Sequence, residues 1–190
     1  MKPSLLLIGL GNPGAQYKRT RHNVGYLALD RLSGEFGEGD WDVKQKFLSD
    51  VQEARVSVAP ALLMKPTTYM NLSGDAVRKA VTYYKLRPAS QIIVFVDDID
   101  LPLGDVRFRM TGGPGTHNGM KSIVDSIGKD FPRIRIGIGP KPAKGNLAAW
   151  VLSALTAGET KKLGEAFDRL PDMVRKFVME SSEHSENAED

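Results

Sequence analysis

Near its N-terminus the chain reads Leu5-Leu6-Leu7-Ile8-Gly9, a continuous apolar run. A second run of this kind, residues 92–96, reads Ile-Ile-Val-Phe-Val. Short runs that are apolar at every residue are typical of central strands whose two faces are both covered by helices. We therefore predict an α/β fold built on a layered sheet.

Apolar spacing elsewhere indicates the elements around these two strands. Residues 24–36 repeat apolar side chains at helical spacing, and residues 56–59 and 62–64 resemble short strands. Residues 134–138 alternate isoleucine with other residues, which indicates a half-buried strand. The sequence thus predicts a mixed, twisted sheet with helices on both faces.

Capping residues and prolines predict where several helices begin and end. Ser73 is placed to cap a helix that runs to about Leu86 and ends before Pro88. The segment from Thr156 to Glu159 has the spacing of a capping box. Pro171 should kink or split the helix that follows, because proline cannot donate a backbone hydrogen bond.

The composition fits one compact domain. The chain has 190 residues, of which 41% are apolar, enough to bury a core without disulfide or metal staples. It contains no cysteine, which excludes disulfides, thiolate catalysis and cysteine-bound metals. We find no repeat and no long linker, and we predict a single domain over residues 1–180.

The charge is unevenly distributed along the chain. The net charge is +3, but residues 181–190 contain four acids and no Lys or Arg, so the remainder is more basic. A basic body favours an anionic partner such as nucleic acid, and the acidic tail is predicted to be disordered. The apolar run near the N-terminus is too short for a signal peptide or a membrane span. We expect a cytoplasmic protein.

Residues 9–14 read Gly-Leu-Gly-Asn-Pro-Gly and match the G-x-G-x-x-G pattern of dinucleotide-binding folds. In those folds a helix begins inside the motif and points its N-terminus at a pyrophosphate. Here Pro13 and the polar residues 16–23 indicate a loop, and helical spacing begins only near Val24. A nucleotide-binding oxidoreductase is therefore an alternative, and we expect no cofactor.

Polar side chains follow the first strand at its carboxyl end, where open α/β sheets bind their ligands. Asn12 would face a cleft there, and the nearby segment 20–23, Thr-Arg-His-Asn, brings His22 into the same loop. Tyr69 and Asn71 lie in a second loop that joins a strand to a helix. The alternative for Asn71 is a purely structural hydrogen bond to its own backbone.

Three acids, Asp97, Asp98 and Asp100, directly follow the buried run at residues 92–96. Acids at this position either bind a metal or orient a histidine. Their spacing does not fit a calcium loop of the EF-hand type, and the zinc motif H-E-x-x-H is absent. A magnesium site stays open, but we favour an orienting carboxylate and expect no metal.

A glycine-rich loop at residues 111–119 leads into an amphipathic helix and contains His117 and Asn118. Cations that could follow a phosphate backbone flank it, namely Arg107, Arg109, Lys121, Arg133 and Arg135. A serine-esterase motif, G-x-S-x-G, is absent. The remaining histidine, aspartate and asparagine residues can activate water and hold an acyl group without a covalent intermediate.

Several long motifs resemble the bacterial-type peptidyl-tRNA hydrolase family. Residues 9–25 match G-L-G-N-P-G-x-x-Y-x-x-T-R-H-N-x-G, and residues 65–74 match K-P-T-T-Y-M-N-L-S-G. Further matches are D-D-I-D-L-P at residues 97–102, T-H-N-G-M-K-S at residues 116–122 and R-I-R-I-G-I-G at residues 133–139. The resemblance spans most of the chain from Leu5 to Leu155.

The resemblance implies hydrolysis of the ester that joins a peptide to tRNA, which recycles tRNA from dropped-off or stalled translation products. His22 would activate water, and Asp98 would hold its imidazole. The other implied roles are substrate and tRNA binding, by Asn12, Tyr17, Tyr69, Asn71, Asn118, Arg109 and Arg135. The expected partner is peptidyl-tRNA; we expect a monomer with no obligate protein partner and no membrane association.

Two other classes of function compete with this reading. A non-catalytic tRNA-binding protein would keep its tRNA affinity after His22→Ala and would cleave no ester. A metal-dependent hydrolase would lose its activity to a chelator. Whether residues 143–152 close over the substrate is left open by the sequence.

Overall fold

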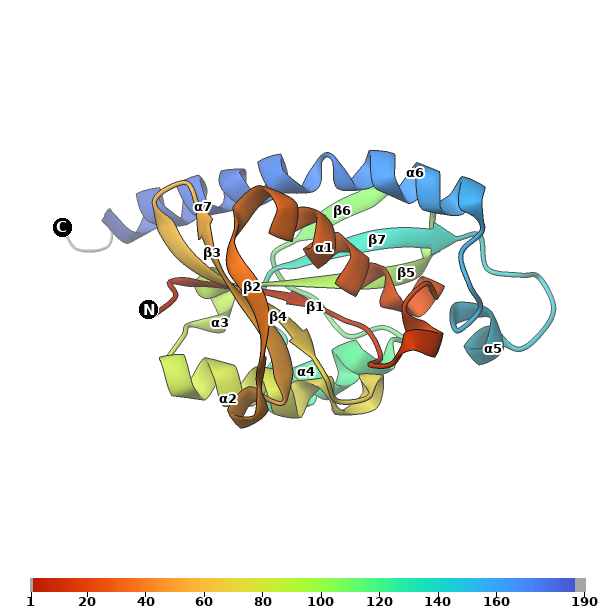
Figure 1. Cartoon of the computed structure of the whole chain (residues 1–190), viewed down its shortest axis with the longest axis horizontal. Helices are drawn as coiled ribbons and strands as arrows, with labels where there is room; N and C mark the ends of the chain where they lie inside the picture. The colour runs from red at the N-terminus through yellow and green to blue at the C-terminus, as the bar shows by residue number, and fades with distance from the viewer. Residues whose placement is uncertain (1, 187–190) are drawn as a thin grey trace.

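The computed structural model describes residues 2–186, which form a seven-stranded sheet between two layers of helices (Figure 1). The strand order across the sheet is β2-β3-β4-β1-β5-β7-β6. The four central strands β4, β1, β5 and β7 run parallel, and both edges are antiparallel. The bounds are β1 (Leu5–Gly9), β2 (Gly37–Lys44), β3 (Ser49–Val56), β4 (Ala59–Pro66), β5 (Ile92–Pro102), β6 (Val106–Arg109) and β7 (Arg133–Gly139). The predicted mixed α/β sheet is confirmed.

Helices cover both faces of this sheet. The α-helices are α1 (Val24–Phe36), α2 (Ser73–Tyr84), α3 (Pro88–Gln91), α4 (Asn118–Ile127), α5 (Leu147–Val151), α6 (Ala157–Phe167) and α7 (Leu170–Glu186). Four 3-10 turns are η1 (Ala15–Tyr17), η2 (Arg21–Asn23), η3 (Gln45–Phe47) and η4 (Met70–Leu72). One core lies under α1, α6 and α7, and a second lies under α2 and α4.

The first strand shows why its residues are apolar without alternation. Leu5 and Leu7 belong to the core under α1, whereas Leu6 and Ile8 belong to the core under α2 and α4. Successive side chains of a strand point to opposite faces, so both sets are buried only because helices cover both sides. The sequence prediction for β1 is confirmed on this point.

Three local predictions are wrong. Residues 56–59 are not one strand: Ser57 has a positive φ of 55°, and the chain turns there between β3 and β4. Ser73 does not cap α2, because its hydroxyl donates to the Met70 carbonyl and no side chain caps this helix. Pro88 does not end α2; Lys85 ends it in a left-handed conformation, and Pro88 begins α3.

Two further expectations are corrected near the C-terminal half. Strand β7 is not half-buried, because nearly every residue in it is buried on a sheet covered from both sides. The predicted disorder from residue 181 is wrong for residues 181–186, which continue α7, and residues 187–190 lie outside the described part. The helix is split before Pro171 as predicted, since α6 ends at Phe167 and α7 begins at Leu170.

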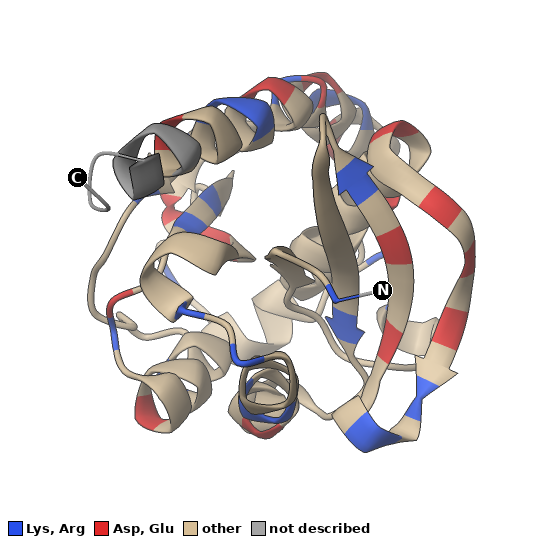
Figure 2. Ribbon diagram, turned by 90° about the vertical axis from the view of Figure 1, so that its left-hand side faces the viewer, with Lys and Arg blue, Asp and Glu red and all other residues tan. Residues whose placement is uncertain are grey.

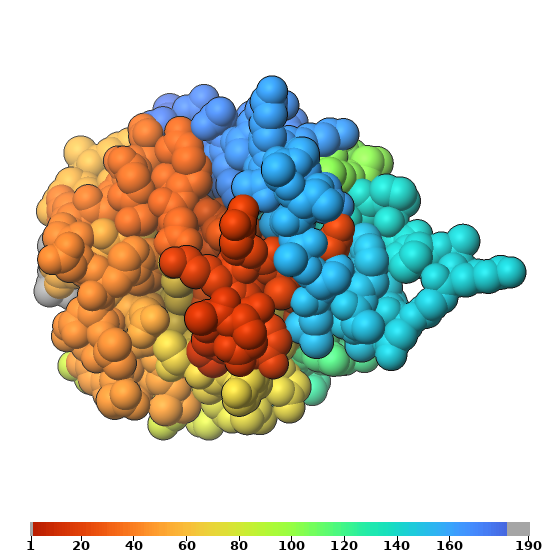
Figure 3. All heavy atoms as spheres, turned by 45° about the vertical axis from the view of Figure 1, so that its right-hand side comes forward, coloured from red at the N-terminus to blue at the C-terminus, as the bar shows by residue number. Residues whose placement is uncertain are grey.

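The parallel strands bring their following segments to one edge of the molecule. The segment after β1 contains η1 and η2, the one after β4 contains η4, and the one after β7 contains α5. Figure 3 shows the segment between β7 and α5 standing out from the body at this end. Figure 2 shows acidic residues along β2 and β3, at the edge of the sheet opposite β6; we call these two strands the acidic flank. Within the described residues, no helix has the length and apolar character needed to cross a membrane.

Candidate active site

A cleft of about 1070 Å³ opens where these segments meet. Its walls combine polar and charged side chains with apolar ones. Its lining includes most residues that the sequence singled out, namely Asn12, His22, Tyr69, Asn71, Asp98, Arg109, Asn118 and Arg135. The volume is large for a small metabolite and suits a substrate that enters only in part.

His22 lies in η2, the short turn between β1 and α1. Its Nδ1 is 2.9 Å from Oδ2 of Asp97, a carboxylate whose side chain is only 1% exposed. A carboxylate can only accept, so this contact assigns the proton to Nδ1 and leaves Nε2 as the acceptor nitrogen. Nε2 makes no hydrogen bond to any of residues 2–186 that the structure describes.

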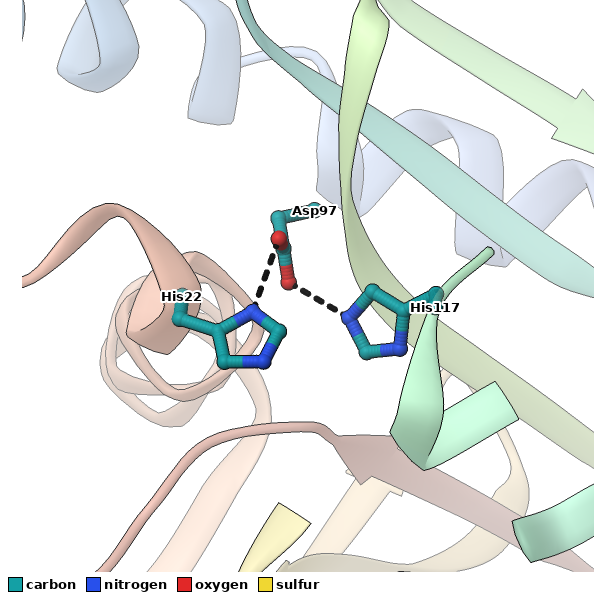
Figure 4. Close-up of side chains that lie close together, drawn as sticks. All are labelled: His22, Asp97 and His117. Carbon is teal, nitrogen blue, oxygen red and sulfur yellow. Dashed lines mark hydrogen bonds and ion pairs between the residues drawn. The ribbon is translucent and has the colours of Figure 1, made fainter. Parts of the chain in front are cut away.

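His117 binds the other oxygen of the same carboxylate (Figure 4). Its Nε2 is 2.8 Å from Oδ1 of Asp97, and its Nδ1 accepts from the backbone N–H of Met120 at 3.2 Å. In these two contacts Nε2 faces the carboxylate as the donor and Nδ1 is the acceptor. The ring centroids of His22 and His117 lie 4.8 Å apart. One buried carboxylate thus holds two imidazoles.

Asp97 and His22 shift each other's pKa, and His117 adds to the shift of Asp97. Burial by itself would raise the pKa of Asp97, but attraction and hydrogen bonds from His117 and His22 outweigh burial and hold that pKa well below its usual range. Burial by itself would lower the pKa of His22, but the charge of Asp97 and its hydrogen bond outweigh burial and raise it. The site therefore strengthens His22 as a base.

The expected bond between Asp98 and His22 is not formed, and Asp97 takes that position. Strand β5 keeps its register through Asp98, so residues 97 and 98 point to opposite faces of the sheet. Phe95, which shares a face with Asp97, packs in the core under α1, the helix that directly follows His22. The alternation within the apolar run was the signal that could have identified Asp97.

Asp98 has a different set of partners. Its Oδ1 accepts from the backbone N–H of Asp100 at 2.9 Å, and its Oδ2 pairs with Nε of Arg135 on β7. Asp98 lines the cleft, but it contacts neither histidine. We therefore withdraw its assignment as the orienting carboxylate.

Asn12 is buried at the end of β1 and is fixed by two neighbours. The side chain of Asn23 binds the backbone of Asn12 at two atoms. Its Oδ1 accepts from the Asn12 N–H at 3.0 Å, and its Nδ2 donates to the Asn12 carbonyl at 2.9 Å. The Oδ1 of Asn12 accepts from the N–H of Met70 at 2.8 Å. Since the amide oxygen is occupied, the amide nitrogen of Asn12 is left to donate in the cleft.

Asn71 and Asn118 lie at the start of two helices on the same wall of the cleft. Asn71 is in η4 before α2, and Asn118 is the first residue of α4. Both are exposed and line the cleft, and neither side-chain amide bonds another residue in the described range. Both amides are therefore available to a ligand. Tyr69 is exposed beside them on the same wall.

The remaining predicted residues divide between the cleft and its surroundings. Arg109 is exposed and lines the cleft, and Arg135 lines it while paired with Asp98. Tyr17 is half-buried in η1 and does not line the cleft, so its role in substrate or tRNA binding stays a prediction.

Comparison with known proteins agrees with this arrangement. The family model described as peptidyl-tRNA hydrolase matches residues 6–189. The chain belongs to the peptidyl-tRNA hydrolase family. It is 46% identical over 165 residues to the peptidyl-tRNA hydrolase of Rhodospirillum centenum, covering 87% of this chain and 71% of the relative. It is 44% identical over 174 residues to that of Fervidobacterium nodosum, covering 92% and 89%.

A solved structure of this family has the same fold. The crystal structure of peptidyl-tRNA hydrolase from Acinetobacter baumannii has a TM-score of 0.87 and 32% identity, covering 98% of this chain and 94% of that one. The family resemblance predicted from sequence is confirmed, and the protein is a hydrolase of the peptidyl-tRNA hydrolase family.

Several residues of this peptidyl-tRNA hydrolase site were not singled out from sequence. Asn23 was seen only as part of a motif, although it holds Asn12. His117 was counted as a histidine but not placed beside Asp97, since the two are 20 residues apart. Arg133 was read as a surface cation, yet it is buried and donates to the carbonyls of Gly112 and Gly113 in the glycine-rich loop.

Within the part of the chain that the structure describes, His22, Asp97 and His117 are also a group that could hold a metal. One ligand atom from each of His22, Asp97 and His117 lies within 4.8 Å of the others. Two imidazoles and a carboxylate can bind zinc or iron. A metal would have to displace the protons through which both histidines bind Asp97. The structure therefore leaves a metal-dependent hydrolase as an alternative to be tested.

Proposed function

We propose that this enzyme hydrolyses the ester between peptide and tRNA in peptidyl-tRNA, with water activated by His22 and without a covalent intermediate. The observation that carries the proposal is the hydrogen bond from His22 Nδ1 to the buried carboxylate of Asp97. This bond leaves the basic Nε2 free in a cleft lined by amide side chains. Membership of the peptidyl-tRNA hydrolase family supports the choice of substrate.

The reaction would proceed through two proton transfers. His22 Nε2 takes a proton from water, and the resulting hydroxide attacks the ester carbonyl carbon to give a tetrahedral oxyanion. The intermediate collapses and breaks the bond to the ribose oxygen of tRNA, which takes the proton back from the imidazolium. The products are free tRNA and the free peptide, whose new carboxylic acid releases its proton to the solvent. Asp97 stabilises the imidazolium that forms between the two steps.

The asparagines would supply hydrogen bonds around the ester. Asn71 and Asn118 have amide groups that no other described residue engages, and they are suited to donate to the developing oxyanion. Asn12 would act as a donor through its amide nitrogen, since its oxygen already accepts from Met70. An N-blocked substrate presents an amide carbonyl to this donor, whereas a free ammonium group presents another donor. This difference supports discrimination against free aminoacyl-tRNA.

The cations beside the cleft would bind tRNA phosphates. Arg109 is exposed, which suits it to a phosphate contact. Arg135 is paired with Asp98, so a phosphate would compete with or add to that pair. Tyr69 is exposed next to Asn71, where it can stack on a terminal base. We further propose that the enzyme acts as a monomer in the cytoplasm and recycles tRNA from dropped-off or stalled products.

The decisive experiment measures tRNA release from N-acetylated and free aminoacyl-tRNA by the wild type and His22→Ala, with a chelator present. We expect rapid cleavage of the blocked substrate alone, lost in His22→Ala and retained in the control His184→Ala. Loss of wild-type activity with the chelator would favour a metal-dependent hydrolase. Tight tRNA binding without cleavage would favour a non-catalytic binding protein.

A further inference from the structure

Arg21 directly precedes His22 in η2, yet its side chain points away from the cleft. The side chain is buried, with 9% of its surface exposed, and it enters the interface between η2 and residues 150–159. A buried guanidinium beside the proposed base requires a reason, because burying a charge is costly unless it is fully paired.

The guanidinium binds several groups of one neighbouring segment. Its Nη1 donates to Ser153 Oγ at 2.6 Å and to the carbonyls of Ser153 and Ala154 at 3.3 and 3.0 Å. Its Nη2 pairs with Glu159 Oε1 at 2.6 Å. Its central carbon lies 5.2 Å from the ring centroid of Trp150. One planar cation therefore holds both ends of residues 150–159.

Backbone contacts reinforce this attachment. The N–H of Arg21 donates to the Ser153 carbonyl at 3.2 Å, and the N–H of Leu155 donates to the Arg19 carbonyl at 2.8 Å. Thr20 and Ala154 form an isolated antiparallel β-bridge. The turn that carries His22 is thus paired with the chain that follows α5.

The other side of the same segment forms a wall of the cleft. We call residues 147–152 the α5 arm. Leu147, Ala148, Val151 and Leu152 of this arm line the cleft. Ser153, which Arg21 holds, directly follows the arm, and Trp150, over which the guanidinium lies, is part of it. Figure 3 shows this part of the chain adjoining the turns that follow β1.

Stability alone does not account for Arg21. Its Nε is buried without a hydrogen-bond partner among the described residues, so the side chain is not fully satisfied. Buried ion pairs are also weak sources of stability compared with apolar packing. What arginine supplies is geometry, because its fork reaches the Ser153 and Glu159 sides together, and a lysine ammonium has only one nitrogen.

We propose that Arg21 is a positioning residue that fixes the α5 arm relative to His22. Substrate is then held between the arm and the amide wall with its ester against Nε2 of His22. The inference rests on the proposed function for the role of His22, whereas the anchoring of the arm can be measured without activity. A misplacement of about 1 Å between ester and base can reduce turnover by roughly 100-fold.

The test compares Arg21→Lys and Glu159→Gln with the control Arg175→Lys. Arg175 also pairs with carboxylates, those of Glu35 and Asp172, but on the α7 side, away from the cleft. We expect Arg21→Lys to lower kcat by roughly 10- to 100-fold for N-acetylated aminoacyl-tRNA, with a smaller effect in Glu159→Gln. In Arg21→Lys, the acid limb of the pH profile of kcat should coincide with that of the wild type, because Asp97 still binds His22.

The arm itself is monitored by fluorescence. The chain has two tryptophans, so a Trp41→Phe background leaves Trp150 as the reporter. We expect Arg21→Lys to shift the Trp150 emission and to increase hydrogen exchange at the Leu155 amide, and Arg175→Lys to change neither. The inference would be overturned if Arg21→Lys had the same kcat as the wild type and the same hydrogen exchange at the Leu155 amide. It would also be overturned if its activity fell only in proportion to the unfolded fraction of the protein.

If the proposed function is wrong, the experiment gives a result that differs from a failure of the Arg21 inference. In that case the wild type releases no tRNA, while the Trp150 shift and the exchange at Leu155 still report whether Arg21 anchors the arm. If Arg21→Lys does not fold, Glu159→Gln carries the test, because it removes the charge partner and keeps an oxygen for the Thr156 N–H. An unchanged kcat and Trp150 emission in that variant would also overturn the inference.

Discussion

The replacement Asp97→Asn separates the role of this carboxylate from that of its neighbour. The carboxylate accepts from both His22 and His117, whereas an asparagine has one accepting oxygen and one donating nitrogen. One of the two histidines must therefore lose the proton from the ring nitrogen that faces residue 97. His117 resists this change because its Nδ1 accepts from the Met120 N–H. We expect His22 to move its proton to Nε2, where it can no longer act as a base.

The size of this effect follows from the lost charge and the lost tautomer. At about 4 Å and an effective dielectric constant of about 20, a unit charge pair is worth about 4 kcal/mol. At about 1.36 kcal/mol per factor of ten, this corresponds to roughly 10³ in rate. A positioned base contributes roughly 10²–10⁴-fold, which brackets the same value. We expect Asp97→Asn to lower kcat by about 10³-fold.

The assay is single-turnover release of tRNA from N-acetylated aminoacyl-tRNA, with Asp98→Asn as the matched variant. Asp98 is the adjacent carboxylate but contacts Arg135 and not His22, so its loss should reduce kcat by less than about tenfold. Circular dichroism checks that both variants fold. Equal losses in the two variants, or a loss in Asp97→Asn below about tenfold, would refute the reasoning.

Three further predictions concern proton binding, tRNA binding and packing. The raised pKa of His22 means that its neutral, active form is lost at a higher pH than for an ordinary histidine, so the pH profile of kcat should fall on the acid side above about pH 6.5. Arg109→Gln should weaken tRNA binding and reduce the slope of log Kd against log salt by roughly 0.7–0.9, whereas Arg55→Gln on the acidic flank should not. Gly74→Ala should destabilise the fold by about 1–3 kcal/mol in urea unfolding, since its Cβ would lie 2.0 Å from a backbone carbonyl of α4. Gly164→Ala, with nothing within 4 Å, should be neutral or stabilising by about 0.4–1 kcal/mol.

Much of the candidate site could be predicted because it lies at strand ends. The apolar run of β1 places Asn12 at its carboxyl end, and His22 follows in the same connection. The cleft then brings these residues together with Asn71, which follows the parallel strand β4, as the parallel arrangement requires. Asn118 follows the antiparallel strand β6, and only the folded loop before α4 brings it to the same cleft. Their chemical roles remain proposals, because position alone does not establish catalysis.

Predictions failed where a shift of one residue along a strand, or a contact with a distant residue, decides which side chain lies in the site. The choice between Asp97 and Asp98 depends on where β5 ends, and the strand runs to Pro102 and not to residue 96 as expected. Arg133 was misread because only the folded chain shows that its guanidinium is enclosed by loop carbonyls. Short-range spacing carries no information about such partners.

The sequence by itself determined the layered α/β sheet, the loops that bear the polar residues and the family resemblance. These follow from local patterns of apolar residues, glycine and proline, which act over a few residues. Only the tertiary structure decided that Asp97 holds His22 and His117 together and that Arg21 binds the chain beyond α5. Residues 22, 97 and 117 are far apart in the chain, and hydrogen bonds act over about 3 Å, so their contacts exist only once the sheet has brought the three segments to one edge.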